Sequence, residues 1–480
     1  MSEDQERDPD DVHQHLRDVQ ELLSRQKLVE DLVLRQDMPR HDLVEDLVHR
    51  QHLAELQHRL DELHPADIAF ILESLPLDDR LFLWSLVKAE RDGEILLEVS
   101  DAVRESLIET MDSQELKAAA ESLDADELAD LAPDLPPEVI QDVFQSLDTE
   151  GREQLRAAMS YSEDTVGALM DFDMVTVRED VTLEVVLRYL RRFEELPEHT
   201  DKLFVVDREE HLRGILSLEQ LLINDPETLV SALMRTETII SFEPDDDADD
   251  AAQAFERYDL ISAPVIDSEK RVIGRLTVTD VVDYIREETE QEILANAGLR
   301  EEEDIFASVW DSVKNRWGWL AINMVTAIIA SRVIGAFEGS IEKLVALAAL
   351  MPIIAGIGGN SGNQTITMIV RAIAMGQVEQ TAMKRLIRKE MGVALINGMF
   401  WGGFLGLMAW WLYDSWSLGL VMTSAMVLNL LLAASAGVLI PMIRSRLGRD
   451  PALGSSVMIT GLTDSGGFFI FLGLATIFLL

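Results

Sequence analysis

The chain contains no cysteine among its 480 residues. This absence excludes a disulfide framework, thiolate catalysis and cysteine-ligated zinc or iron–sulfur sites. Basic residues are also scarce, with 41 Lys and Arg against 87 Asp and Glu and a formal net charge of −46. Because nucleic-acid phosphates repel such a chain, we expect no nucleic-acid partner. The sequence also has no P-loop, nucleophile–base pairing or phosphorylation motif, so we do not expect an enzyme.

The charge imbalance is confined to the first 300 residues, because residues 301–480 hold 12 acids and 12 bases. The second part is also the apolar part of the chain. The first residues, MSEDQERDPDD, have neither a basic region nor an apolar run, so we expect no signal peptide there. The sequence therefore predicts an acidic region in the cytoplasm followed by a membrane region.

Two helical regions are expected first along the chain. Residues 1–60 contain a repeat, LVEDLVLRQ at Leu28–Gln36 and LVEDLVHRQ at Leu43–Gln51, whose leucines have helical spacing. We interpret this segment as a charged helical extension of the next domain, with an interaction arm as the alternative. In residues 61–160, Pro, Asp and Ser precede short helical patterns. That pattern predicts a superhelical array of short helices.

After Tyr161 the pattern changes to short β-branched runs that alternate with helical stretches. The order repeats after about 60 residues, so that Asp207 and Gly214 match Asp267 and Gly274. The copies, 161–227 and 228–287, resemble a tandem pair of CBS domains. CBS pairs often bind adenine nucleotides, so the resemblance implies ATP as a candidate ligand, with Thr277 and Asp280 of Thr277-Val-Thr-Asp280 holding the ribose. The first copy has Ser217-Leu-Glu-Gln220 there and lacks the acid.

The second half contains five segments long enough to cross the roughly 30 Å hydrocarbon core of a bilayer. They are Trp317–Phe337, Ile341–Val370, Met391–Leu412, Leu418–Ile443 and Leu453–Leu479. Basic residues gather between the second and third segments and after the fourth. The positive-inside rule places those connections in the cytoplasm, together with the N-terminus, and leaves the C-terminus outside. We therefore expect a multi-pass protein of the cell (inner) membrane.

The second segment carries a polar motif inside an apolar run. Pro352 is followed by Ala355-Gly-Ile-Gly-Gly-Asn-Ser-Gly-Asn-Gln-Thr365, which includes Gly358, Gly359, Asn360, Asn363 and Gln364. Glycines allow helices to approach closely, and amide side chains in a membrane need partners or water. We favour a polar pore wall or hinge here, with simple helix–helix packing as the alternative.

Asp464 lies about 11 residues into the last segment, near the middle of the bilayer. An ionised carboxylate at this depth is costly unless it is hydrated or paired, and its small neighbours leave room for water or an ion. A hydrated Mg²⁺ suits one such carboxylate per subunit, because Mg²⁺ keeps most of its waters. The alternative is a protonated Asp464 bonded to another helix. Asp450 lies beside Arg449 at the expected cytoplasmic end, where a surface salt bridge is the alternative to a cation site.

Across nearly its whole length the chain resembles the MgtE family of magnesium channels or transporters. The resemblance rests on the order of the regions, on the Pro352–Thr365 motif and on Leu447-Gly-Arg-Asp-Pro-Ala-Leu453 followed by Leu462-Thr-Asp464. It implies a multidomain fold: an all-α superhelical N-terminal domain (61–160), two α+β CBS domains, a long connecting or plug helix (288–313) and an all-α transmembrane domain of five helices (314–480). The residues themselves predict an acidic amphipathic helix from Asp283 to about Val309, which connects the repeated copies to the first membrane segment.

The resemblance also implies a homodimer in the lipid bilayer with the pore between the subunits, where Asp464 binds hydrated Mg²⁺ and Asp450 lies near the cytoplasmic mouth. Cytoplasmic Mg²⁺ would close the pore by binding between the N domain, the CBS domains and the plug helix. The matching acids are Asp259, Asp280, Asp283, Glu288, Glu292, Asp249 and Asp124. Such ions would offset the repulsion within the acidic region.

Two other functions are consistent with parts of the sequence. One is a proton- or sodium-coupled carrier of Mg²⁺ or Co²⁺ in which Asp464 titrates. The other is a membrane-tethered nucleotide sensor whose helices only anchor and dimerise it. Asn360, Asn363 and Asp464 argue against the sensor, because an anchor does not need polar groups inside the membrane.

Overall fold

The computed structural model describes residues 11–34, 53–193, 196–299, 304–374, 383–447 and 454–480. The chain divides into two compact units, each described by itself below. The first comprises residues 1–288 and 304–307, and the second comprises residues 289–303 and 308–480.

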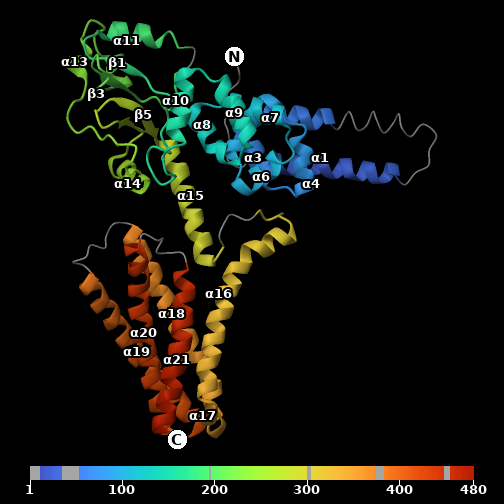
Figure 1. Ribbon diagram of the computed structural model, residues 1–480, viewed down its shortest axis with the longest axis vertical. Helices are drawn as coiled ribbons and strands as arrows, with labels where there is room; N and C mark the ends of the chain where they lie inside the picture. The colour runs from blue at the N-terminus through green and yellow to red at the C-terminus, as the bar shows by residue number, and fades with distance from the viewer. Residues whose placement is uncertain (1–10, 35–52, 194–195, 300–303, 375–382, 448–453) are drawn as a thin grey trace. The chain divides into compact units, whose positions relative to one another are not determined.

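The N-terminal part of the first unit is helical, as the sequence predicts (Figure 1). Its helices are α1 (Asp11–Leu34), α3 (Pro65–Glu73), α4 (Leu77–Trp84), α5 (Asp92–Glu98), α6 (Asp101–Ile108), α7 (Ser113–Glu121), α8 (Ala125–Leu131), α9 (Pro137–Ser146) and α10 (Thr149–Ala158), with short 3₁₀ turns η1 (Ala89–Arg91) and η2 (Ala132–Asp134). Residues 53–62 are also helical. Polar side chains cap the N-termini of several helices. At α7 the Asp112 and Glu115 side chains form a reciprocal capping box.

Helix α1 packs onto this array. Val19 and Leu23 of α1 are buried with Leu56 and Leu60 in the core of the helical region. The first part of α1, around Val19 and Leu23, therefore belongs to the core of the helical region. The second copy of the leucine repeat, residues 43–51, lies outside the described residues.

The two repeated copies form two small sheets. Strands β1 (Thr176–Arg178), β2 (Lys202–Val206) and β3 (Leu212–Ser217) make one sheet, with β1 parallel and β3 antiparallel to β2. Strands β4 (Ser262–Ile266) and β5 (Val272–Thr277) make the other, antiparallel sheet. The helices are α11 (Leu183–Leu190), α12 (Leu218–Ile223), α13 (Val230–Leu233) and α14 (Ala248–Tyr258). The β-branched run Thr238–Phe242, from which a strand at the start of the second copy would be expected, is not a strand, and Phe242 makes only an isolated bridge to Val265.

The segment that begins each copy packs against the strands of the other copy. A side chain on Gly274 of β5 would collide with Met170, which precedes the first copy's strands, while one on Gly214 of β3 would lie 3.0 Å from the sulfur of Met234. Backbone bridges join Asp171 to Arg275 in one case and Ile215 to Arg235 in the other. Each copy therefore completes the packing of the other.

The connecting helix is shorter than the sequence predicts. Helix α15 spans Val278–Ala297 and ends at Gly298, whose φ is +83°. The N–H of Leu299 donates to the carbonyl of Leu294 at 2.9 Å, the bond that closes a glycine-ended helix. The expectation of one helix to about Val309 is therefore wrong, because glycine takes the left-handed conformation that stops it.

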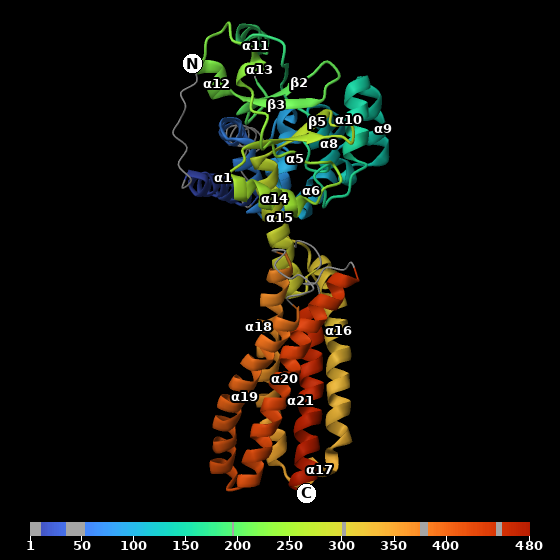
Figure 2. The ribbon, with the colours of Figure 1, turned by 90° about the vertical axis from the view of Figure 1, so that its left-hand side faces the viewer.

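The second unit consists of long helices, seen side by side in Figure 2. They are α16 (Val309–Ala336), α18 (Ala346–Ala374), α19 (Met383–Tyr413), α20 (Trp416–Arg446) and α21 (Ser455–Phe478), with the short α17 (Glu338–Lys343) between the first two. Helix α20 packs against α18, α19 and α21, and α16 packs against α21. The buried core lies mainly around α20.

Four of these helices are long and apolar enough to cross a membrane: residues 312–336 of α16, 384–413 of α19, α20 and α21. Helix α18 is 29 residues long and is not among these four, because glycines and amides interrupt its apolar run. The expected second segment is also interrupted, because α17 ends at Lys343 and α18 begins at Ala346. Helix α19 begins before the expected Met391, because Lys and Arg continue a helix beyond its apolar run.

Candidate functional site

Asp464 is the tenth residue of the 24-residue helix α21, and its side chain is half-buried. Its carboxylate makes no hydrogen bond or ion pair with any other residue in the described part of the chain. Its neighbour Thr463 is fully buried, and the Thr463 hydroxyl lies 3.7 Å from where a side chain on Gly359 of α18 would begin. Asp464 of α21 and Asn360 of α18 therefore lie at a similar level of two packed helices.

Helix α18 divides the polar motif between two faces. Gly358 and Gly359 are buried, whereas Asn360 and Gln364 are exposed in the single chain. Asn363 is half-buried, and its side-chain oxygen accepts a hydrogen bond of 3.2 Å from the Ser456 hydroxyl of α21. The glycine face thus packs against the bundle, while the amide face forms a polar stripe on a helix that is otherwise apolar.

Sequence reasoning missed Asn429 of α20, which is completely buried. Its side-chain N–H donates to the Ile354 carbonyl of α18 at 3.0 Å. A side chain on Gly358 of α18 or on Gly467 of α21 would collide with this amide. Asn429 therefore fills the space between the two helices that carry Asn360 and Asp464. The only sequence signal was one amide within an apolar run.

A second missed residue is Glu390 of α19, whose side chain is buried next to Thr365 of α18. The Thr365 hydroxyl donates to Glu390 at 3.5 Å, and Lys389 lies 3.2 Å from the other carboxylate oxygen. Asp450, the other expected membrane-side acid, lies outside the described residues.

In the first unit, acids of the helical domain face acids of the repeated copies and α15. Burial, together with the negative charge of Asp171, raises the pKa of Asp126 on α8 to about 8. One helical turn later, burial raises the pKa of Asp130 to about 6, with Glu287 and Asp280 adding to the rise and Arg104 opposing it. We call Asp124, Asp126, Asp130, Asp171 and Asp280 the acidic cluster.

The sequence placed Asp124 and Asp280 in this region but missed three of its members. Burial and the charge of Asp173 raise the pKa of Asp124. Asp171 is bound by Arg275 at 2.7 Å, yet burial keeps its pKa raised. The sequence signal for Asp126 and Asp130 was their spacing of four residues, which places both on one face of a helix.

The other expected sensor acids are more scattered. Asp283 lies near Glu98, and burial raises the pKa of both carboxyl groups. Asp249 accepts a hydrogen bond of 3.4 Å from the Tyr284 hydroxyl. Asp259 is exposed and ends α14 in the left-handed conformation. Glu288 is half-buried on α15, and the Glu292 side chain lies outside the described atoms.

Thr277 and Asp280, the expected nucleotide ligands, bind each other. One Asp280 carboxylate oxygen accepts from the Thr277 backbone N–H at 2.9 Å and from its hydroxyl at 2.8 Å. This arrangement caps the start of α15. The same carboxylate raises the pKa of Asp130, so it contributes to the acidic cluster.

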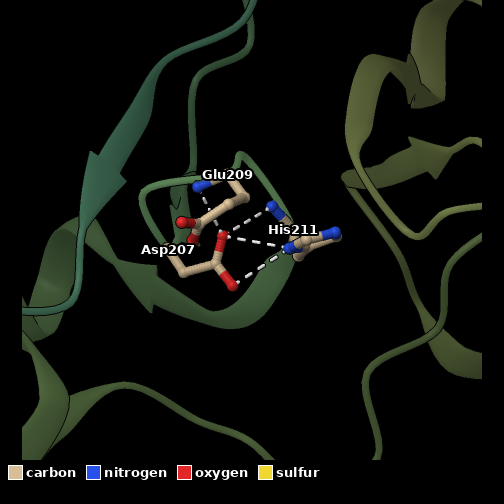
Figure 3. A group of neighbouring side chains, drawn as sticks. All are labelled: Asp207, Glu209 and His211. Carbon is tan, nitrogen blue, oxygen red and sulfur yellow. Dashed lines mark hydrogen bonds and ion pairs between the residues drawn. The ribbon is translucent and has the colours of Figure 1, made fainter.

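Asp207, Glu209 and His211 form the one compact group of metal-ligand type among the described residues (Figure 3). Its geometry is that of a hairpin turn. The Asp207 carboxylate accepts from the backbone N–H groups of Glu209 and His211 and from Arg213. In the second copy, Asp267 accepts the matching backbone bonds, with Arg271 in place of His211. The repeated bonds indicate a structural turn.

Family models match three parts of the chain. A model described as "MgtE: Divalent cation transporter" matches residues 351–474, and the "MgtE intracellular N domain" matches residues 63–164. CBS domain models match residues 166–225 and 230–287.

Two relatives that match this chain over most of their length are magnesium transporters. The chain is 32% identical over 431 residues to the magnesium transporter MgtE of Thermus thermophilus, covering 88% of this chain and 95% of that protein. It is 26% identical over 420 residues to the magnesium transporter MgtE of Bacillus subtilis, covering 88% of this chain and 93% of that protein. A solved structure of the cytosolic domain of the Mg²⁺ channel MgtE in complex with ATP has 31% identity, covers 50% of this chain and 98% of that one, and has a TM-score of 0.45.

Proposed function

The chain belongs to the MgtE family of transporters, which is not a family of enzymes, and on that premise we propose that it conducts Mg²⁺ across the cell membrane as a homodimer. In this proposal five helices cross the bilayer, α18 among them, with the N-terminus in the cytoplasm and the C-terminus outside. The transported ion passes Asp464 with most of its hydration shell in place.

The polar stripe of α18 beside Asp464 carries the proposal. Asn360 and Gln364 are exposed in the single chain, and the Asp464 carboxylate has no hydrogen-bond or ion-pair partner among the described residues. Lipid cannot satisfy such groups, so they need water, an ion or a second subunit. A water-filled pore between two copies of the chain would supply water, the ion and the second subunit. Amide and carboxylate oxygens then face the outer waters of Mg²⁺, which dehydrates reluctantly.

The test is Mg²⁺ flux into proteoliposomes without a proton or sodium gradient, for the wild type, Asp464→Asn and the control Asp414→Asn. Asp414 lies between α19 and α20, outside both helices. We expect flux in the wild type and the control, and its loss in Asp464→Asn. Equal flux in all three would make Asp464 structural.

The unpartnered Asp464 carboxylate also favours a second candidate, a proton- or sodium-coupled carrier of Mg²⁺ or Co²⁺ in which Asp464 titrates. The same proteoliposomes separate the two. Flux that appears only after a proton or sodium gradient is imposed supports the carrier and contradicts the passive pore.

We further propose that cytoplasmic Mg²⁺ closes the pore by binding at the acidic cluster. Carboxylates held close together in a packed structure repel one another, and a divalent cation between them removes that repulsion. The negative charge of Asp171 acts on Asp126 of the helical domain, and that of Asp280 acts on Asp130, so a hydrated Mg²⁺ between these carboxylates would offset their repulsion. The sensor acids Asp259, Asp283, Asp249, Glu288 and Glu292 remain predictions, as do pore ligation by Asp450 and ATP binding at the CBS domains.

A further inference from the structure

Arg80 of α4 is a fully buried cation in the first part of the helical domain, next to the end of α3. Its guanidinium donates to the Leu72 carbonyl at 2.9 Å and to the Leu75 carbonyl at 3.2 Å, at the end of α3. A third bond, of 3.4 Å, reaches the Ser106 hydroxyl. These acceptors are neutral, so a buried Arg80 still needs a negative partner.

That partner is Asp304, which is 224 residues away in the chain. The Arg80 guanidinium lies 2.7 Å from the Asp304 carboxylate, whose side chain is only 9% exposed. The other Asp304 carboxylate oxygen accepts from the Phe306 backbone N–H at 2.9 Å. Asp304 therefore ties down the short turn that precedes α16, which begins at Val309.

An internal repeat shows that this partner is unusual. Arg104, 24 residues after Arg80, binds the end of α5 as Arg80 binds the end of α3. Its guanidinium donates to the carbonyls of Leu96 at 2.7 Å and Val99 at 3.2 Å, which correspond to Leu72 and Leu75. Arg104 binds two acids of the same helical domain, Asp134 at 3.2 Å and Asp101 at 3.2 Å.

The acids around Arg104 have no acidic counterparts 24 residues earlier in the chain, around Arg80. The residue 24 positions before Asp134 is Thr110, and the residue 24 positions before Asp130, whose pKa the Arg104 charge lowers, is Ser106. Neither carries a charge. The buried cation at Arg80 is therefore completed by the segment that leads into α16.

We propose that Arg80 is a docking site on the helical domain for Asp304, and that this ion pair couples the helical domain to the first membrane helix directly. This inference rests on the proposed Mg²⁺ conduction and its closure by cytoplasmic Mg²⁺. The coupling runs through the 304–308 segment and does not require the CBS domains to transmit it.

The test uses the full chain with Asp304→Ala, Ser106→Asp combined with Asp304→Ala, and the control Asp134→Ala. The double variant returns a carboxylate to Arg80 from within the helical domain, which restores that domain's stability without re-docking the segment. The control removes the equivalent acid from Arg104. Two quantities are measured: hydrogen exchange of residues 304–312, and the cytoplasmic Mg²⁺ concentration that halves the flux.

We expect faster exchange of residues 304–312 in both Asp304 variants and unchanged exchange there in Asp134→Ala. We also expect the half-inhibiting Mg²⁺ concentration to rise about fivefold or more in both Asp304 variants, the lower range of typical coupling between sites. Unchanged exchange, unchanged inhibition, or inhibition restored by the double variant would overturn the proposal. Absence of wild-type flux would overturn the proposed function, and exchange alone would then decide whether the segment docks.

Discussion

The Asn429 amide of α20 donates to the Ile354 carbonyl of α18 at 3.0 Å inside the fully buried centre of the membrane unit. A hydrogen bond from a side chain to a helix carbonyl fixes two helices at one level. It does so here because Gly358 has no side chain to keep the amide away.

We predict that Gly358→Ala destabilises the membrane unit by about 1–3 kcal/mol, because the new methyl group overlaps Asn429 and breaks its bond to Ile354. The double variant Gly358→Ala with Asn429→Ala removes the overlap and should be more stable than Gly358→Ala alone. Gly403→Ala is the control, because an added methyl there meets nothing within 4 Å. Thermal unfolding in detergent measures all of them. Strictly additive losses in the double variant would contradict the contact.

A second prediction concerns pH. Burial and the Asp171 charge raise the pKa of Asp126 from 3.8 to about 8, so the packed first unit holds a proton that the unfolded chain releases. Stability should therefore fall as the pH rises from about 4 to about 8. In the presence of a chelator, we expect a lower unfolding midpoint at about pH 8.5 than at about pH 5.5.

Mg²⁺ should restore much of this stability at the higher pH, where protons no longer compete for the carboxylates. Asp126→Asn should weaken both the pH dependence and the Mg²⁺ effect. Asp142→Asn, at an exposed acid of α9, is the matched control and should behave like the wild type. A midpoint that does not change with pH in the wild type would rule out the raised pKa.

A third prediction concerns the turn at Asp207. His211→Arg introduces the residue of the second copy and should leave the unfolding midpoint nearly unchanged, with or without divalent cations. Asp207→Ala should lower it by a few degrees, because the backbone N–H groups of Glu209 and His211 lose their acceptor. A divalent-cation stabilisation that disappears in His211→Arg would instead identify a metal site.

The repeat was readable from the sequence because its signals are local. Two copies 60 residues apart predicted matching strands, and the structure pairs Lys202 with Ser217 and Ser262 with Thr277 in the same register. Both hairpins also have their irregularity at the same place, at Val205–Val206 and at Val265–Ile266. Alternating apolar residues and a shared turn determine such features within about 20 residues.

Contacts made across the fold left only weak signals in the sequence. Asp126 and Asp130 looked like ordinary surface acids of a short helix, and only the packing of Asp171 and Asp280 nearby sets them apart. Asn429 was a single amide in an apolar helix, and its partners are a carbonyl and glycines, which carry no distinctive side chain. Arg80 and Asp304 are separated by 224 residues.

The exchange of first segments between the two repeated copies bears on how such a pair arises. Met170 packs over Gly274 of the other copy, and Met234 packs over Gly214. A copy expressed by itself would lack the segment that covers its own hairpin glycine. Two identical single copies could supply that segment to each other, so the tandem pair has the architecture of a segment-swapped dimer contained in one chain.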